Sequence, residues 1–197
     1  MANFNKHQLA HWMELVRNYD DGIEAFWPSQ INAKAWIADS LEFNLYMPQC
    51  HSVVIFGAWY GVLADMLRIQ DTICVDKEAK YLEWCAKKYD VWQGCMSKFE
   101  YEYDPDVVIN TVTEHISQEV YEEWFRKIPK ETFYILQGNN DTTVEDHVRP
   151  FTDLGDFIQK NACSNYVYSD SRPYEGSWNE KENKPNYFDR YMIIGKK

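Results

Sequence analysis

The chain has 197 residues, a formal net charge of −11 at pH 7 and a hydrophobic share of 45%. This length suits one domain with a sizeable core and is short for two. The acidic balance makes nucleic acid an unlikely partner, because tight binding of a phosphate backbone needs clustered Lys and Arg. No apolar run reaches the roughly 18 residues that a membrane span requires, so no membrane segment is predicted.

The first part of the chain predicts two helices, over residues 5–18 and 29–41. Apolar side chains recur at helical spacing in both stretches. Pro28 precedes the second helix, and Pro48 closes this N-terminal helical segment, residues 1–48.

Short apolar runs and amphipathic stretches then alternate along the chain. The runs predict buried strands at residues 52–56, 72–75, 91–93, 106–110 and 132–137. Helices are predicted between and after them at residues 62–69, 79–88, 118–127 and 151–159. Strands that alternate with helices imply a parallel sheet with right-handed crossovers.

The last part of the chain has a different pattern. Residues 165–169 and 190–195 are strand-like, and the polar stretch 170–186, with Pro173 and Pro185, predicts a long loop between them. This pattern indicates an antiparallel hairpin at one sheet edge. The fold class is therefore α/β, with a Rossmann-like, mostly parallel seven-stranded sheet, helices on both faces and a C-terminal antiparallel hairpin.

A glycine-bounded loop, residues 57–61, follows the first predicted strand and opens a helix. Glycine lets the backbone approach a ligand closely, and ligands of open α/β sheets bind beyond the carboxyl ends of the strands. Asp76 ends the next strand, where a carboxylate can accept both ribose hydroxyls of a nucleoside. We predict a nucleoside site; the alternative is that the glycines only form turns and Asp76 only caps a helix.

The spacing of the glycines in this loop argues against two classes of phosphate-binding site. Gly57 and Gly61 are separated by residues that are not glycine, so the G-x-G-x-x-G pattern of dinucleotide sites is absent. The G-x-x-x-x-G-K-[ST] pattern of nucleotide triphosphate sites is also absent. A nucleoside cofactor without a pyrophosphate suits the sparser loop.

Residues 52–110 resemble the class I S-adenosylmethionine-dependent methyltransferases. The resemblance rests on the succession of strand, glycine loop, helix and strand, and on Asp76, which matches the ribose-binding acidic residue of the family in position and type. The loop departs from the family by placing two aromatic residues between its glycines; its sequence is Gly57, Ala58, Trp59, Tyr60 and Gly61. The resemblance implies that S-adenosylmethionine is the cofactor. The expected cofactor-binding residues are Gly57, Trp59, Tyr60, Gly61, Asp76, Lys77, Asn110 and Thr111.

The resemblance also implies a position for the N-terminal helical segment. The whole chain, residues 1–197, is predicted to be one methyltransferase-like domain in which residues 1–48 pack over the cofactor site. Of Trp59 and Tyr60, we expect one to pack on the N-terminal helices and the other to contact the cofactor. Either Lys34 or Gln30 is expected to reach the methionine carboxylate.

A narrower resemblance rests on three short segments. Residues 57–61, 110–115 and 137–140 are similar to small methyltransferase-like proteins of tailed bacteriophages. This resemblance implies a location in the host cytoplasm. A cytoplasmic location is also predicted from the five cysteines, whose odd number and lack of C-x-x-C spacing favour reduced thiols.

Polar residues follow the fourth and fifth predicted strands, and they are the candidate reaction site. Thr113, Glu114 and His115 are predicted to be catalytic, with Glu114 or His115 as a general base or as an orienting group. The alternative is that Thr113 caps a helix and His115 lines the surface. The residues predicted to bind substrate are Gln137, Asn139 and Asn140, which alternatively form only a turn.

Two further observations limit the function. The N-P-P-[YFW] motif of enzymes that methylate DNA amino groups is missing. No metal site is predicted, because His7 and His11 share a helix face without an evident third ligand. A substrate lid is expected at the rim of the sheet, with the candidate residues Arg172, Tyr174, Trp178 and Arg190.

The sequence thus predicts an S-adenosylmethionine-dependent methyltransferase that acts on a small molecule or a protein. Two alternatives stay open at this point. One is an enzyme that cleaves or otherwise uses S-adenosylmethionine without methyl transfer. The other is a non-catalytic binding protein that retains the fold. The oligomeric state does not follow from the sequence.

Overall fold

The computed structural model describes residues 6–44, 50–161, 163, 165–179 and 183–197. Pro48, predicted to close the N-terminal segment, lies outside these residues. Among the described helices, none combines the length and the apolar character needed to cross a lipid bilayer. All five cysteines are free thiols.

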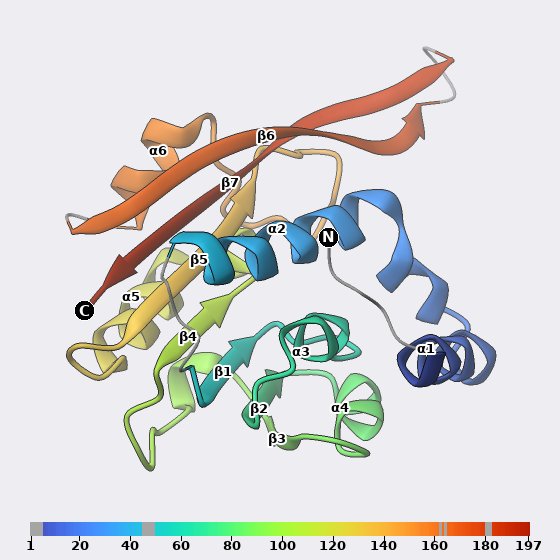
Figure 1. Ribbon diagram of the computed structural model, residues 1–197. Coiled ribbons are helices and arrows are strands. Elements are labelled where there is room, and N and C mark those ends of the chain that lie inside the picture. The colour runs from blue at the N-terminus through green and yellow to red at the C-terminus, as the bar shows by residue number, and fades with distance from the viewer. Residues whose placement is uncertain (1–5, 45–49, 162, 164, 180–182) are drawn as a thin grey trace.

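Seven strands form one sheet at the centre of the molecule (Figure 1). Their bounds are β1 Ser52–Phe56, β2 Asp71–Asp76, β3 Asp90–Gln93, β4 Val107–Asn110, β5 Phe133–Asn139, β6 Tyr166–Asn179 and β7 Lys184–Lys196. The order is β3-β2-β1-β4-β5-β7-β6; β1 to β5 pair in parallel, and β7 is antiparallel to both β5 and β6.

Helices cover both faces of this sheet. Their bounds are α1 Lys6–Asn18, η1 Gly22–Phe26, α2 Pro28–Asn44, α3 Val62–Leu67, α4 Ala79–Cys85, η2 Met96–Lys98, η3 Thr113–His115, α5 Gln118–Lys127 and α6 Leu154–Lys160. On one face α2, α3 and α4 bury Ile37, Leu63 and Leu82 against the sheet. On the other face α5 and α6 bury Trp124 and Phe157. The predicted fold class is confirmed.

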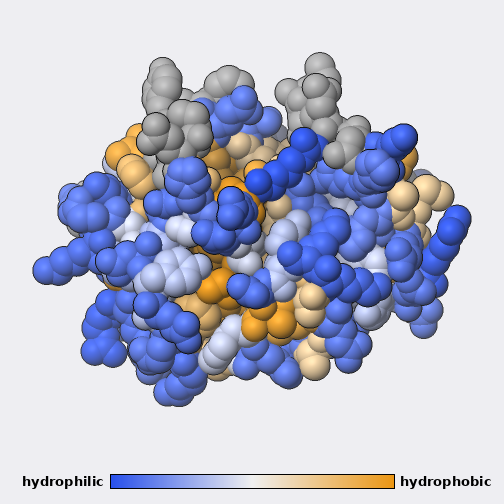
Figure 2. Space-filling model, turned by 60° about the horizontal axis from the view of Figure 1, so that its bottom comes forward, coloured by the Kyte–Doolittle hydropathy of each residue, from blue (hydrophilic) through white to orange (hydrophobic). Residues whose placement is uncertain are grey.

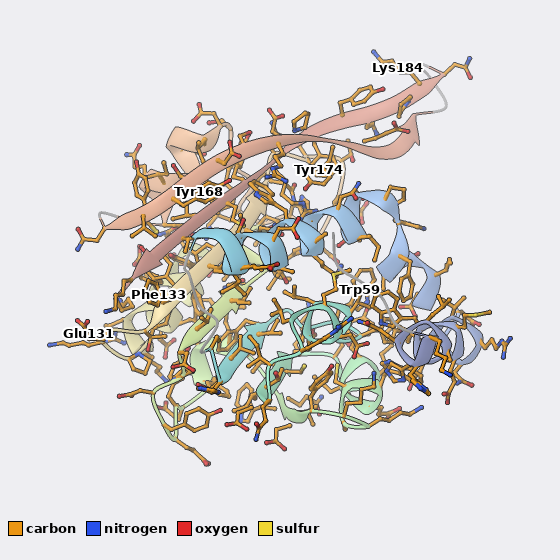
Figure 3. The ribbon with its side chains drawn as sticks, in the orientation of Figure 1. Trp59, Glu131, Phe133, Tyr168, Tyr174 and Lys184 are labelled. Carbon is orange, nitrogen blue, oxygen red and sulfur yellow. The ribbon has the colours of Figure 1, made fainter. Side chains whose placement is uncertain are left out.

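The C-terminal hairpin is longer than predicted. The prediction of a long loop over residues 170–186 is wrong, because β6 continues to Asn179 and β7 already begins at Lys184. Tyr174 pairs with Phe188 across the two strands, and their stacked rings lie 6.0 Å apart. Figure 1 shows the hairpin reaching beyond the rest of the molecule, with Lys184 near its end in Figure 3.

Several helix bounds differ from the predicted ones; for example, α4 ends at Cys85 and not at residue 88. Two of the differences have a local cause. α3 ends at Leu67 because Arg68 adopts a left-handed backbone, with φ of 56°, which a helix cannot continue. α6 begins only at Leu154 because the Asp153 side chain accepts a hydrogen bond from the Asp156 amide at 2.8 Å. Such an N-cap satisfies an amide that has no partner inside the helix.

Polar residues cover most of the surface, in keeping with the acidic composition. Figure 2 shows hydrophilic residues over most of one face, with hydrophobic residues in limited patches between them. Scattered apolar residues are normal on the surface of a folded protein. The apolar side chains that hold the sheet and its helices together are instead buried in the two layers described above.

Asp65 of α3 attaches α1 to the rest of the fold. Its buried carboxylate accepts hydrogen bonds from Trp12 Nε1 at 2.7 Å, Tyr89 Oη at 2.7 Å and Lys88 Nζ at 2.9 Å. Gln8 Nε2 also donates to the Asp65 carbonyl oxygen at 2.7 Å. A buried charge is stable only with such a set of donors, so these bonds specify how α1 docks.

We expect Asp65→Ala to lower the free energy of unfolding by about 3–5 kcal/mol, as for the loss of one partner of a buried ionic network. The change leaves the Trp12 indole and the Tyr89 hydroxyl without their buried acceptor. Urea unfolding followed by tryptophan fluorescence measures the loss. Asp71→Ala, at an exposed aspartate, is the control, and an equal loss in both variants would contradict the role of Asp65.

Candidate functional site

Loop 57–61 lies at the carboxyl end of β1, between β2 and β4 in the sheet. The amides of Gly57 and Ala58 donate to the Val75 carbonyl oxygen at 3.0 Å and 3.1 Å, which holds the loop against β2. Gly57 has a φ of 70°, and a Cβ atom there would lie 2.3 Å from Val112 Cγ1. Only glycine fits this position, for both its dihedral angle and its close approach.

Asp76, at the end of β2, is hydrogen-bonded to this loop. Its Oδ2 accepts from the Trp59 amide at 2.9 Å, and its Oδ1 accepts from the Glu78 amide at 3.1 Å. The residue is partly exposed. Each carboxylate oxygen can accept more than one hydrogen bond, so the carboxylate retains acceptor capacity for a ligand.

Trp59 and Tyr60 point into different surroundings. Tyr60 is buried, and its hydroxyl donates to Asp21 Oδ1 at 2.5 Å. The other carboxylate oxygen, Asp21 Oδ2, forms an ion pair with Lys80 Nζ at 2.7 Å. Trp59 is only partly buried and lies between α3 and the N-terminal helices in Figure 3. Tyr60 is therefore the aromatic residue that packs on the N-terminal segment, and a cofactor contact of Trp59 stays a prediction.

Lys34 of α2 lies beside the loop, with its Nζ 5.3 Å from the Trp59 ring centroid. Burial, together with the positive charge of Arg190, lowers the pKa of Lys34 to about 7. The polar contacts of Lys34 Nζ are with Gln30, at 3.2 Å to the side-chain oxygen and 3.4 Å to the carbonyl oxygen. Within the described residues, no carboxylate forms an ion pair with it.

Arg190 of β7 adds a second buried cation to this region. Only 6% of the residue is exposed, and its Nε has no hydrogen-bond partner within the described part of the chain. Two buried cations without an anion are costly, because desolvation is not offset by an opposite charge. Lys34 and Arg190 together therefore favour a negatively charged ligand group.

Side chains at the end of β4 connect the loop to the neighbouring strands. Thr111 donates its hydroxyl to the Gly57 carbonyl oxygen at 3.0 Å, and Asn110 Oδ1 accepts from the Val112 amide at 3.0 Å. The buried Thr113 donates its hydroxyl to the Gln137 carbonyl oxygen at 2.6 Å. These hydrogen bonds give the three residues a structural role. Their predicted roles in catalysis and cofactor binding stay predictions.

The amides predicted to bind substrate also have partners within the protein. Gln137 Nε2 donates to the Ala33 carbonyl oxygen at 3.0 Å. Asn139 Nδ2 donates to Glu114 Oε1, and Asn140 Oδ1 accepts from the Asp189 amide. These bonds connect the end of β5 to α2, η3 and β7.

Glu114 and His115 meet His147, which is not among the residues predicted to be catalytic or to bind substrate. Glu114 is buried, and His147, from the loop after β5, lies with its Nε2 4.0 Å from Glu114 Oε1. The ring centroids of His115 and His147 are 4.6 Å apart. Neighbouring groups desolvate the His115 ring and lower its pKa, while the Glu114 charge opposes this effect. His115 is therefore neutral near pH 7 and able to accept a proton.

The expected lid residues lie on the hairpin strands rather than on a loop. The Arg172 guanidinium carbon lies 4.4 Å from the Trp36 ring centroid, so β6 contacts α2. A hollow of about 500 Å³ lies between these two elements. The Trp178 side chain is outside the described part of the structure, and Lys77 is exposed beside Asp76.

No model of a known protein family matches the sequence, and no curated protein matches it. Solved structures do match. The N-methyltransferase NodS from Bradyrhizobium japonicum, in complex with S-adenosyl-L-homocysteine, aligns with a TM-score of 0.64 and 9% identity, over 94% of this chain and 98% of that chain.

Two other solved structures agree with this match. A possible histamine N-methyltransferase from Thermotoga maritima has a TM-score of 0.59 and 13% identity, over 94% of this chain and 99% of that chain. A SAM-dependent methyltransferase from Archaeoglobus fulgidus has a TM-score of 0.58 and 15% identity, over 83% and 94%. The chain therefore has the fold of class I S-adenosylmethionine-dependent methyltransferases.

We expect Lys34→Met to stabilise the protein most at low pH. Burial and Arg190 lower the pKa of Lys34 from 10.5 in the unfolded chain to about 7 in the folded protein. The charged Lys34 therefore destabilises the folded protein by its full amount below about pH 7. This destabilisation decreases as the pH rises from about 7 toward 10.5. At about 1.4 kcal/mol per pKa unit, the expected gain is roughly 5 kcal/mol at about pH 6, and it shrinks to roughly 2 kcal/mol by about pH 9.

Urea unfolding of both proteins at several pH values measures this difference. Lys130→Met, at an exposed lysine, serves as the control and should show a difference that does not change with pH. A Lys34→Met gain that is absent at low pH, or that grows toward high pH, would show that Lys34 is not a buried cation without a counterion.

Proposed function

We propose that this chain is an S-adenosylmethionine-dependent methyltransferase that acts on a small molecule or a protein. The observation that carries the proposal is the hydrogen bond between the Trp59 amide and Asp76 Oδ2, 2.9 Å long, at the carboxyl ends of β1 and β2. It holds a carboxylate beside a loop that only glycine can start. In an open α/β sheet, this edge is where ligands bind.

The residues at this edge fit the parts of the proposed cofactor. Asp76 offers acceptor capacity for two ribose hydroxyls. Lys34 and Arg190 offer buried positive charge with no counterion among the residues that the structure describes, which suits the carboxylate of the methionine part. The fold, shared with methyltransferase structures, supports the same assignment. When bound, S-adenosylmethionine supplies the methyl group.

The residues after β4 are the candidates for handling the acceptor. His115, neutral near pH 7, is the candidate to remove a proton from the acceptor, and the buried Glu114 is the candidate to orient it. The net charge of −11 favours a small molecule or a protein over nucleic acid. The resemblance to tailed-phage proteins, with its implied location in a host cytoplasm, stays a prediction.

Binding of S-adenosylhomocysteine, measured by calorimetry, tests the cofactor assignment. We expect Asp76→Ala to weaken binding by about 10- to 100-fold, because hydrogen bonds to a charged group contribute roughly 1.5–3 kcal/mol. Asp71→Ala, at the opposite end of the same strand, is the matched control and should bind as the wild type does. Absence of binding by a folded wild-type protein would refute the proposed cofactor.

A second comparison tests the proposed carboxylate site. We expect Lys34→Met to weaken binding of S-adenosylhomocysteine by about tenfold or more. Binding of 5′-methylthioadenosine, which lacks the amino acid group, should not change. Equal weakening for both ligands would mean that Lys34 acts on the nucleoside or on the shape of the loop, and not on the carboxylate.

A further inference from the structure

We propose that Glu114, His115 and His147 form a binding site for Zn²⁺. The three side chains each offer one ligand atom, and these atoms lie within 4.8 Å of one another. Zinc binds imidazole nitrogen and carboxylate oxygen at about 2.0–2.2 Å, so two ligands of one ion lie about 3–4 Å apart. The observed separations, at most 4.8 Å, exceed this spacing by no more than about 1–2 Å.

His147 is already oriented as a metal ligand. Its Nδ1 lies 2.5 Å from the Asp141 carbonyl oxygen, and because a carbonyl can only accept, Nδ1 carries the proton. The lone pair of Nε2 is then available, and Nε2 is the atom 4.0 Å from Glu114 Oε1. Metal-binding histidines commonly donate their other ring N–H to a backbone carbonyl in this way. The Asp141 side chain in turn accepts from the Thr143 amide at 2.9 Å, which supports this turn.

Glu114 provides a second, independent observation. It is 2% exposed, and its Oε1 accepts from Asn139 Nδ2. Its Oε2 is buried and has no hydrogen-bond partner within the described residues. The nearby Arg149 guanidinium donates elsewhere, to the Thr113 carbonyl and to Gln118. A buried carboxylate oxygen without a donor is costly, and a metal ion would remove that cost.

The kinds of ligand decide which ion fits. Two imidazoles and one carboxylate suit Zn²⁺, whereas Mg²⁺ and Ca²⁺ prefer sites made of oxygen atoms. Three protein ligands leave a coordination position open, as in catalytic zinc sites. His115 is exposed, so the open position is accessible from solvent.

A role for the ion rests on the proposed function, whereas its binding does not. The site lies at the carboxyl edge of β4 and β5 and includes two of the residues proposed to handle the acceptor. With the ion bound, Glu114 and His115 would act as its ligands, and the ion would take the place of His115 in activating the acceptor. There, the open position can hold a hydroxyl or thiol of the acceptor and lower its pKa, which makes it a better nucleophile. The site therefore favours acceptors with an ionisable oxygen or sulfur atom.

Calorimetric titration of the chelator-treated full chain with Zn²⁺ tests the site, and Co²⁺ serves as its visible spectroscopic probe. We expect one Zn²⁺ per chain, tetrahedral Co²⁺ absorption that Zn²⁺ displaces, and no comparable binding of Mg²⁺. His147→Gln and Glu114→Gln should each weaken Zn²⁺ binding at least tenfold. His51→Gln, at an exposed histidine before β1, is the control and should bind as the wild type does.

Three results would overturn the proposed zinc site. They are absence of Zn²⁺ binding by the folded wild type, preference for Mg²⁺, and unchanged Zn²⁺ binding in both variants. Thermal unfolding without metal shows that the variants fold. S-adenosylhomocysteine binding, measured on the same samples without metal, separates the two proposals. A wild-type protein that binds S-adenosylhomocysteine but no Zn²⁺ contradicts only the metal site, and a wild-type protein that binds Zn²⁺ but no S-adenosylhomocysteine contradicts only the cofactor.

Discussion

Gly57 and Val112 approach each other so closely that no side chain fits between the ends of β1 and β4. The same contact region contains the hydrogen bond from the Thr111 hydroxyl to the Gly57 carbonyl oxygen. Loop 57–61 is therefore attached to the segment that leads into η3, at the point where the order of the strands in the sheet reverses. The positions of Asp76, on the β2 side, and of Glu114, on the β4 side, depend on this contact between Gly57 and Val112.

Elements whose pattern is local are predictable from the sequence. The strand at Ser52–Phe56 and the helix at Gln118–Lys127 have the predicted bounds, because an apolar run and an amphipathic period each depend on neighbouring residues only. The hairpin between Tyr166 and Lys196 is different. Its polar stretch becomes strand because Tyr174 stacks on Phe188 from the other strand, and such a pairing is not visible in a local pattern.

In the candidate site, too, local features are predictable from the sequence and contacts between distant residues are not. Gly57 and Asp76 are found from the sequence because their positions relative to strand ends carry the signal. The burial of Lys34 beside Arg190, and the meeting of Glu114 with His147, arise from contacts between distant elements. Single-sequence periodicity carries no information on such contacts. The sequence therefore identifies Lys34, Glu114 and His115 as candidates one by one, and only the structure shows which residues they meet.

The projecting hairpin has a consequence for behaviour at high concentration. β6 is the last strand of the sheet, and an open strand edge can recruit the backbone of another molecule. Pro173 interrupts the row of N–H donors along this strand, since proline has none. The same residue that suggests a loop in the sequence thus hinders the strand-to-strand stacking that leads to aggregates.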